Sequence, residues 1–213
     1  MIRARPAKEH SITRASDLIS GGNLGQFASR RAFALLVLFL SMLASAPRAE
    51  IVESGAGCAQ GCRWPKLPHL TGWHSDERAN ITYGENGLAS LVPDGTNFQD
   101  ADAVIYGQAF PKARLAATDS GARTLAAFIA GDKAAFVAGN KQIVIAEAPA
   151  LATADGQKLS SFTFFRSQDK TWERVCYGEE AGYFLVFAIS AHSEAGYRSQ
   201  QAAFEYVIQH YRP

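Results

Sequence analysis

Trp172-Glu-Arg-Val-Cys-Tyr177, followed by Tyr183-Phe-Leu-Val-Phe-Ala-Ile189, is the stretch that decides the fold. The first run alternates, so an extended chain places Glu173, Val175 and Tyr177 on one face and Trp172, Arg174 and Cys176 on the other. The second run is seven apolar residues long, which is typical of a strand buried on both faces. Residues 178–182 between them have the length of a hairpin loop. The stretch therefore predicts two antiparallel strands at the centre of a sheet.

A helix is predicted directly after the second strand. Its apolar residues recur at helical spacing and form one stripe: Tyr197, Phe204, Val207, Ile208 and Tyr211. Ser193 can cap the helix and Glu194 favours its first turn. We therefore expect a C-terminal helix lying across the central strand.

The chain before this stretch predicts more strands and one further helix. Strands are expected at residues 81–84, 88–92, 103–110, 142–146 and 159–166, with glycine-containing turn signals at 85–87, 93–95 and 155–156. A helix capped by Asp119 or Ser120 should end at Gly131, with a short further turn at 132–136. Short turns favour antiparallel pairing, and one-sided apolar helices must lie on the sheet. The predicted fold class is α+β, a mainly antiparallel β-sheet flanked by two helices.

The first 49 residues have the layout of an export signal peptide with a long leading segment. Arg30-Arg31 precedes the apolar run at 32–44, which is too short to span a bilayer and ends in small residues. Cleavage is expected after Ala46 or Ala49. Ser29-Arg-Arg-Ala-Phe33 resembles a twin-arginine signal, so that route and the general secretory route both stay open, as does Met1 as the true start. The expected location is periplasmic or secreted.

Removing the leader changes the charge of the protein. Residues 1–49 hold 7 Lys and Arg against 2 Asp and Glu, whereas residues 50–213 hold 14 against 18. No cluster of basic residues remains, so nothing suggests binding to nucleic acid or to an anionic membrane surface. No second apolar run of spanning length follows. We expect a flexible linker at 50–66 and a single domain at 67–213, without a membrane span.

Two cysteines and one tryptophan lie near the start of the exported part, and a third cysteine lies in the stretch that decides the fold. Cys58 and Cys62 are close enough to form a disulfide in an oxidising compartment. Cys176 is either a small core residue or the alternative partner of one of them. Trp64 lies in the expected linker, where it can contact a partner or pack back onto the domain.

Few residues suggest catalysis or metal binding. Ser190 and His192 end the buried strand and would share a face if the strand continued, which makes them the nearest approach to a nucleophile and base. His74, with His69, Asp76 and Glu77 nearby, lacks the tight spacing of a metal site. The adjacent Glu179 and Glu180 suit a solvated turn better than an acid–base pair. We expect no metal and no cofactor.

Four features of the chain together carry a resemblance to a known family: Gly72-Trp73, the segment Leu125-Ala-Ala-Phe-Ile129, Asp155-Gly156, and the final strand and helix. They resemble the PsbP-like group, which includes DcrB-like bacterial envelope proteins. The resemblance lies in the order of elements over about residues 70–213 and carries over no functional residue. It implies an antiparallel sheet with flanking helices and a non-catalytic role. We therefore expect an exported soluble envelope protein that binds or assembles with an unidentified protein or small ligand. The alternatives are a small secreted hydrolase, built on Ser190, His192 or His74, and a secreted inhibitor.

Overall fold

A seven-stranded antiparallel sheet forms the centre of the fold in the computed structural model, which describes residues 51–54, 61–82, 87–117, 121–139, 142–180 and 182–213. Its strand order is β3-β4-β5-β9-β8-β7-β6. The strands are β3 (Trp73–His74), β4 (Ala89–Pro93), β5 (Ala103–Pro111), β6 (Ile143–Ala152), β7 (Lys158–Arg166), β8 (Thr171–Glu180) and β9 (Tyr183–Ala191). The predicted α+β class is confirmed, because helices flank this antiparallel sheet.

The predicted hairpin of β8 and β9 is present, with a tighter connection than expected. Pairing runs from Trp172 opposite Ala191 to Glu180 opposite Tyr183, so β8 continues through the residues expected to form the loop. Gly178 lies inside β8, and a Cβ there would come within 2.6 Å of the Leu159 side chain. The glycine therefore serves close packing rather than the turn. β9 has β5 on its other side, which explains its apolar sequence.

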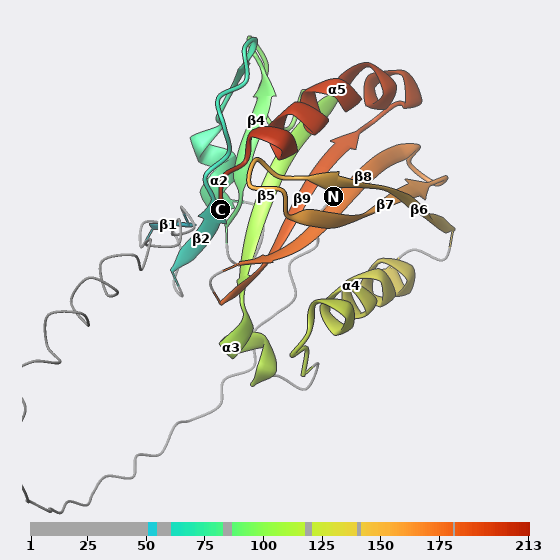
Figure 1. Ribbon diagram of the computed structural model, residues 1–213. Helices are drawn as coiled ribbons and strands as arrows, with labels where there is room; N and C mark the ends of the chain where they lie inside the picture. The colour runs from blue at the N-terminus through green and yellow to red at the C-terminus, as the bar shows by residue number, and fades with distance from the viewer. Residues whose placement is uncertain (1–50, 55–60, 83–86, 118–120, 140–141, 181) are drawn as a thin grey trace, which may run out of the picture. The chain divides into compact units, whose positions relative to one another are not determined.

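The face of the sheet that carries the odd-numbered residues of β9 is covered by α5 (Glu194–His210), as Figure 1 shows. Ser193 caps this helix, since its Oγ accepts a hydrogen bond of 2.9 Å from the Gly196 amide. The predicted stripe is buried against Ile105, Phe187 and Ile189 of the sheet. Both the helix and its N-cap are confirmed.

The opposite face, with the even-numbered residues of β9, is covered by α4 (Leu125–Gly139). This helix runs through Gly131, so the predicted end at that residue is wrong, and the expected short turn at 132–136 belongs to the same helix. The Thr124 hydroxyl accepts a hydrogen bond of 3.2 Å from the Ala127 amide, while the expected caps Asp119 and Ser120 lie outside the described residues. The sheet supplies the contacts that carry the helix past glycine.

Two short helices also depart from the sequence-based expectations. The predicted strand at 81–84 is wrong where it is described, because α2 (Glu77–Thr82) occupies residues 81 and 82. Asp76 starts this helix, since its Oδ1 accepts a hydrogen bond of 3.0 Å from the Ala79 amide. A second short helix, α3 (Lys112–Ala116), follows β5 directly and was not expected.

The predicted linker at 50–66 contains a hairpin, which corrects that expectation. β1 (Ile51–Ser54) pairs antiparallel with β2 (Cys62–Pro65). Ile51 packs on the core beneath α5, and a Cβ added at Gly107 of β5 would come within 2.7 Å of Pro65. The described part of this segment is therefore packed on the domain. Among the helices of the described residues, none has the length and apolar character needed to cross a membrane.

Candidate functional site

Ser190 and His192 are not joined by a hydrogen bond in the described part of the chain. The Ser190 hydroxyl donates instead to Oε1 of Glu173 on the neighbouring strand, at 3.0 Å. His192 lies just beyond β9 and is exposed, and its backbone amide donates to the Asp102 carbonyl oxygen at 2.9 Å. A hydroxyl held by a carboxylate, with the imidazole elsewhere, lacks the geometry of an activated nucleophile.

His74 and its polar neighbours have separate roles. Its Nδ1 lies 3.3 Å from Oδ1 of Asp94, and both side chains are exposed. Asp76 caps α2 and also accepts a hydrogen bond of 2.9 Å from the Phe98 amide, so its carboxylate organises the chain locally. Within the described residues, no three His, Cys, Asp or Glu side chains gather as metal ligands would.

The structure tests only some of the expectations for the cysteines and for Trp64. Cys176 is a free thiol at 0% exposure, so it is a core residue, and burial raises its pKa to about 11. Cys62 is fully buried in β2, but Cys58 lies outside the described residues, so the bridge between them stays a prediction. Trp64 is half-buried, and a Cβ at Gly87 would lie 2.8 Å from its Cζ3, so the ring packs against that glycine.

A cavity of about 160 Å³ lies between α4 and the sheet. The helix contributes Asp132 and Phe136 to its lining, and the strands contribute the remaining residues: Tyr106, Gln108, Phe110, Val175 and Val186. The lining is thus aromatic and aliphatic, with one carboxylate, one amide and one phenol. A concave apolar site with a few converging polar groups is the usual form of a ligand pocket.

Asp132 is the ionisable group that α4 turns toward the sheet at this cavity. Its Oδ2 accepts a hydrogen bond of 2.6 Å from the hydroxyl of Tyr177, which is fully buried. Burial raises the pKa of Asp132, and the bond from Tyr177 opposes this in part. Burial and the adjacent carboxylate likewise raise the pKa of Tyr177. The pair therefore keeps its proton on the phenol and presents a poorly hydrated carboxylate.

A second polar group lies beside the cavity on the same face of the sheet. Glu173 is 7% exposed, with Nη2 of Arg166 3.6 Å from its Oε1. Burial raises the pKa of Glu173, while Arg166 and the Ser190 hydroxyl lower it. Oε2 of Glu173 and Nε of Arg166 are buried without a hydrogen-bond partner in the described residues. This face therefore holds charged groups whose mutual pairing is incomplete.

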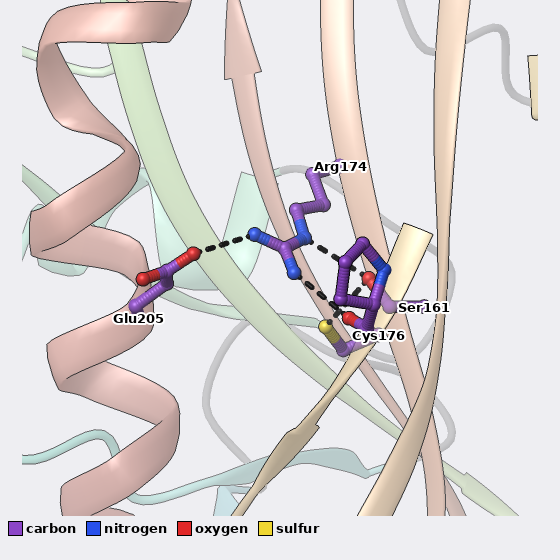
Figure 2. Close-up of polar contacts among 5 residues, drawn as sticks. Ser161, Arg174, Cys176 and Glu205 are labelled. Atoms are coloured by element: carbon purple, nitrogen blue, oxygen red, sulfur yellow. Dashed lines mark hydrogen bonds and ion pairs between the residues drawn. The ribbon is translucent and has the colours of Figure 1, made fainter. Parts of the chain in front are cut away.

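The other face of the sheet holds a buried arginine with a structural role (Figure 2). Arg174 donates from Nε to the Ser161 hydroxyl at 3.0 Å, from Nη1 to Oε1 of Glu205 at 2.8 Å and from Nη2 to the Pro149 carbonyl at 2.9 Å. Cys176 donates its thiol to the same Ser161 oxygen at 3.5 Å. One guanidinium thus ties β8 to β7, to β6 and to α5, which fixes the helix on the sheet.

Sequence reasoning missed the cavity because its residues are far apart in the chain. One signal was present: the helix Leu125–Gly139 is apolar almost throughout, and Asp132 and Lys133 are its only charged residues. A carboxylate in such a helix must point to water or to a buried partner. The structure places it inward. Lys133 also turns toward the sheet, with Nζ 3.1 Å from the centroid of the Phe162 ring.

No protein-family model matches this chain, and no curated protein matches it either. The resemblance to PsbP-like proteins therefore stays a prediction.

Proposed function

We propose that this protein is an exported, non-catalytic binding module that holds a small ligand in the cavity between α4 and the sheet. The cavity is the single observation that carries the binding role, because Tyr106, Gln108 and Asp132 converge there on an otherwise apolar lining. A cavity of about 150 Å³ is known to hold a benzene-sized molecule. The ligand is therefore expected to be of that size, with a polar group directed at Asp132.

The exported location rests on the leader at residues 1–49 and not on the cavity. An apolar run preceded by arginines and followed by small residues is read by export machinery. Cell fractionation and the mass of the recovered protein test this part. A chain beginning at Pro47 or Glu50 outside the cytoplasm supports export, whereas a cytoplasmic chain that retains residues 1–49 refutes it.

Native mass spectrometry of the protein recovered from its own exported compartment tests the binding role. The expected result is a reproducible added mass that Val186→Phe abolishes, because a phenyl ring at that position occupies the cavity. Val137→Phe is the matched control, since Val137 lies on the same helix but is 49% exposed. It should keep the added mass.

Two outcomes would overturn the binding role: a wild-type protein without any added mass, or an added mass that Val186→Phe leaves in place. Circular dichroism and a urea unfolding curve establish that the variant is folded. If Val186→Phe does not fold, Val175→Leu fills part of the same cavity with a smaller change and replaces it in the comparison.

A further inference from the structure

We propose that the ligand of this cavity is a small organic cation, an alkylammonium of about five to seven non-hydrogen atoms, bound against Asp132 and the surrounding aromatic rings. This inference rests on the proposed binding role of the cavity and names the chemical class that the site would take.

The first observation is a partly buried carboxylate, Asp132, that has no cation paired with it among the described residues. Among the described residues no ion pair reaches Asp132, and its hydrogen bond comes from the neutral phenol of Tyr177. The cations on this face are engaged elsewhere. Arg166 lies 3.5 Å from Asp169 and 3.6 Å from Glu173, Lys112 pairs with Glu179 at 2.9 Å, and Lys133 lies over the Phe162 ring. A bound ammonium would supply the missing positive charge.

The charged groups around the cavity also favour a cation over an anion. Burial is the main cause that raises the pKa of the Tyr106 hydroxyl, and the carboxylates of Glu173 and Asp132 add to this rise, while Arg166 lowers the pKa. Two carboxylates and one guanidinium are therefore the charged groups that act on this hydroxyl at the cavity wall. Such a site repels an anion and attracts a cation.

The second observation is the aromatic character of the wall. Tyr106, Phe110 and Phe136 line the cavity. Phe110 and Phe136 are held in place by ring contacts, with centroid distances of 5.3 Å to Phe128 and 4.8 Å to Phe164. Aromatic rings around a carboxylate are the chemistry that recognises quaternary and primary ammonium groups, because ring faces attract cations that have lost water.

The volume limits the size of the cation. At about 160 Å³ the cavity matches the volume that holds the six carbon atoms of benzene. Tetramethylammonium and choline fall within this range, whereas polyamines and nucleosides exceed it. The Gln108 side chain offers an amide that can bond to a hydroxyl or an N–H of the guest.

A ligand-observed NMR titration compares choline with 3,3-dimethylbutan-1-ol, which has the same shape without the charge. The exported wild-type protein should bind choline at least roughly tenfold more tightly than the neutral alcohol, as expected when a poorly hydrated carboxylate and ring faces meet a cation. Asp132→Asn should remove that preference, so that its affinities for choline and for the alcohol become equal. The amide keeps the size of the side chain and an oxygen that accepts from Tyr177. Glu77→Gln, which removes one exposed carboxylate from α2, should leave both affinities as in the wild type.

The outcomes separate this inference from the proposed function. Equal affinity for the two guests, or a preference for choline that persists in Asp132→Asn, overturns the cationic ligand while the cavity remains a binding site. Binding of neither guest also overturns the cationic class. The proposed binding role is then tested separately, by the added mass in native mass spectrometry and its loss in Val186→Phe.

Discussion

Replacing Arg174 by methionine should lower the free energy of unfolding by about 3 kcal/mol, because three acceptors lose a charged donor while the apolar stem is retained. The acceptors do not contribute equally. Ser161 is 4% exposed, so a hydroxyl oxygen left without the guanidinium costs about 1–2 kcal/mol. Glu205 is 40% exposed, so its carboxylate regains water and accounts for no more than about 1 kcal/mol.

Urea unfolding followed by tryptophan fluorescence measures this loss. The slope of the unfolding free energy against urea concentration should stay the same, because unfolding exposes the same amount of surface in the variant. The urea concentration at the midpoint should fall. For a domain of this size the melting temperature should fall by about 6–10 °C. Arg198→Met is the control, because Arg198 is 73% exposed and its ion pair with Glu194 is worth less than about 0.5 kcal/mol.

The apportionment among the acceptors can also be tested. Glu205→Gln should cost less than about 1 kcal/mol, because the amide oxygen can still accept from Nη1 of Arg174 and the side chain is partly hydrated. A loss below about 1 kcal/mol for Arg174→Met, or a larger loss for Glu205→Gln than for Arg174→Met, would refute this explanation. Either result would mean that packing of α5, and not the arginine, holds the helix on the sheet.

Three further changes test other parts of the fold. Tyr177→Phe removes the hydrogen bond that stabilises the ionised carboxylate of Asp132 and partly lowers its pKa. The pKa of Asp132 in the folded protein lies above its ordinary value, so its ionisation opposes folding as the pH rises through that pKa. Urea unfolding should show that the variant loses about 1–2 kcal/mol of unfolding free energy at pH 7, and that the loss shrinks once acid protonates Asp132. Gly87→Ala should cost at least about 2 kcal/mol in the same assay, because φ is +73° and a Cβ would meet Trp64 and Cys62 at 2.8 Å. Iodoacetamide should leave Cys176 unlabelled at pH 8 until the protein is unfolded, since the thiol is fully buried and burial raises its pKa to about 11; rapid labelling of folded protein would contradict this placement.

The elements that sequence reasoning predicted well are those whose pattern is set by local periodicity. β9 and α5 each bury a continuous set of apolar residues, and Ser193 caps α5 as its hydroxyl and position suggest. The alternating faces of β8 were also predicted correctly, with Arg174 and Cys176 on the α5 side and Val175 and Tyr177 on the α4 side. The spacing of apolar residues along the sequence is enough to predict these features, because the apolar side chains of a packed strand or helix recur with the period of that element.

The errors arose where tertiary contacts override local signals. Gly131 suggested a helix end, but α4 continues past it on contacts from Phe128 and Phe136 to the sheet. The glycine-rich stretch before Cys62 suggested a linker, but β2 pairs with β1 and packs on Gly107. In α4 a glycine that suggests a break in the sequence is compatible with a packed element, and in the second case the strands on either side of the stretch are packed; a single sequence reveals neither.

The two flanking helices are attached to the sheet by opposite chemistry, and this difference bears on where a ligand can act. On the α5 side, the buried guanidinium of Arg174 donates to three acceptors. On the α4 side, the partly buried carboxylate of Asp132 accepts from one neutral donor, Phe128 is the only residue of the helix classed as buried, and a cavity remains. A bound cation would complete the second interface as Arg174 completes the first. Ligand binding should therefore stabilise α4 against local unfolding, seen as slower amide exchange in residues 125–139 without change in α5.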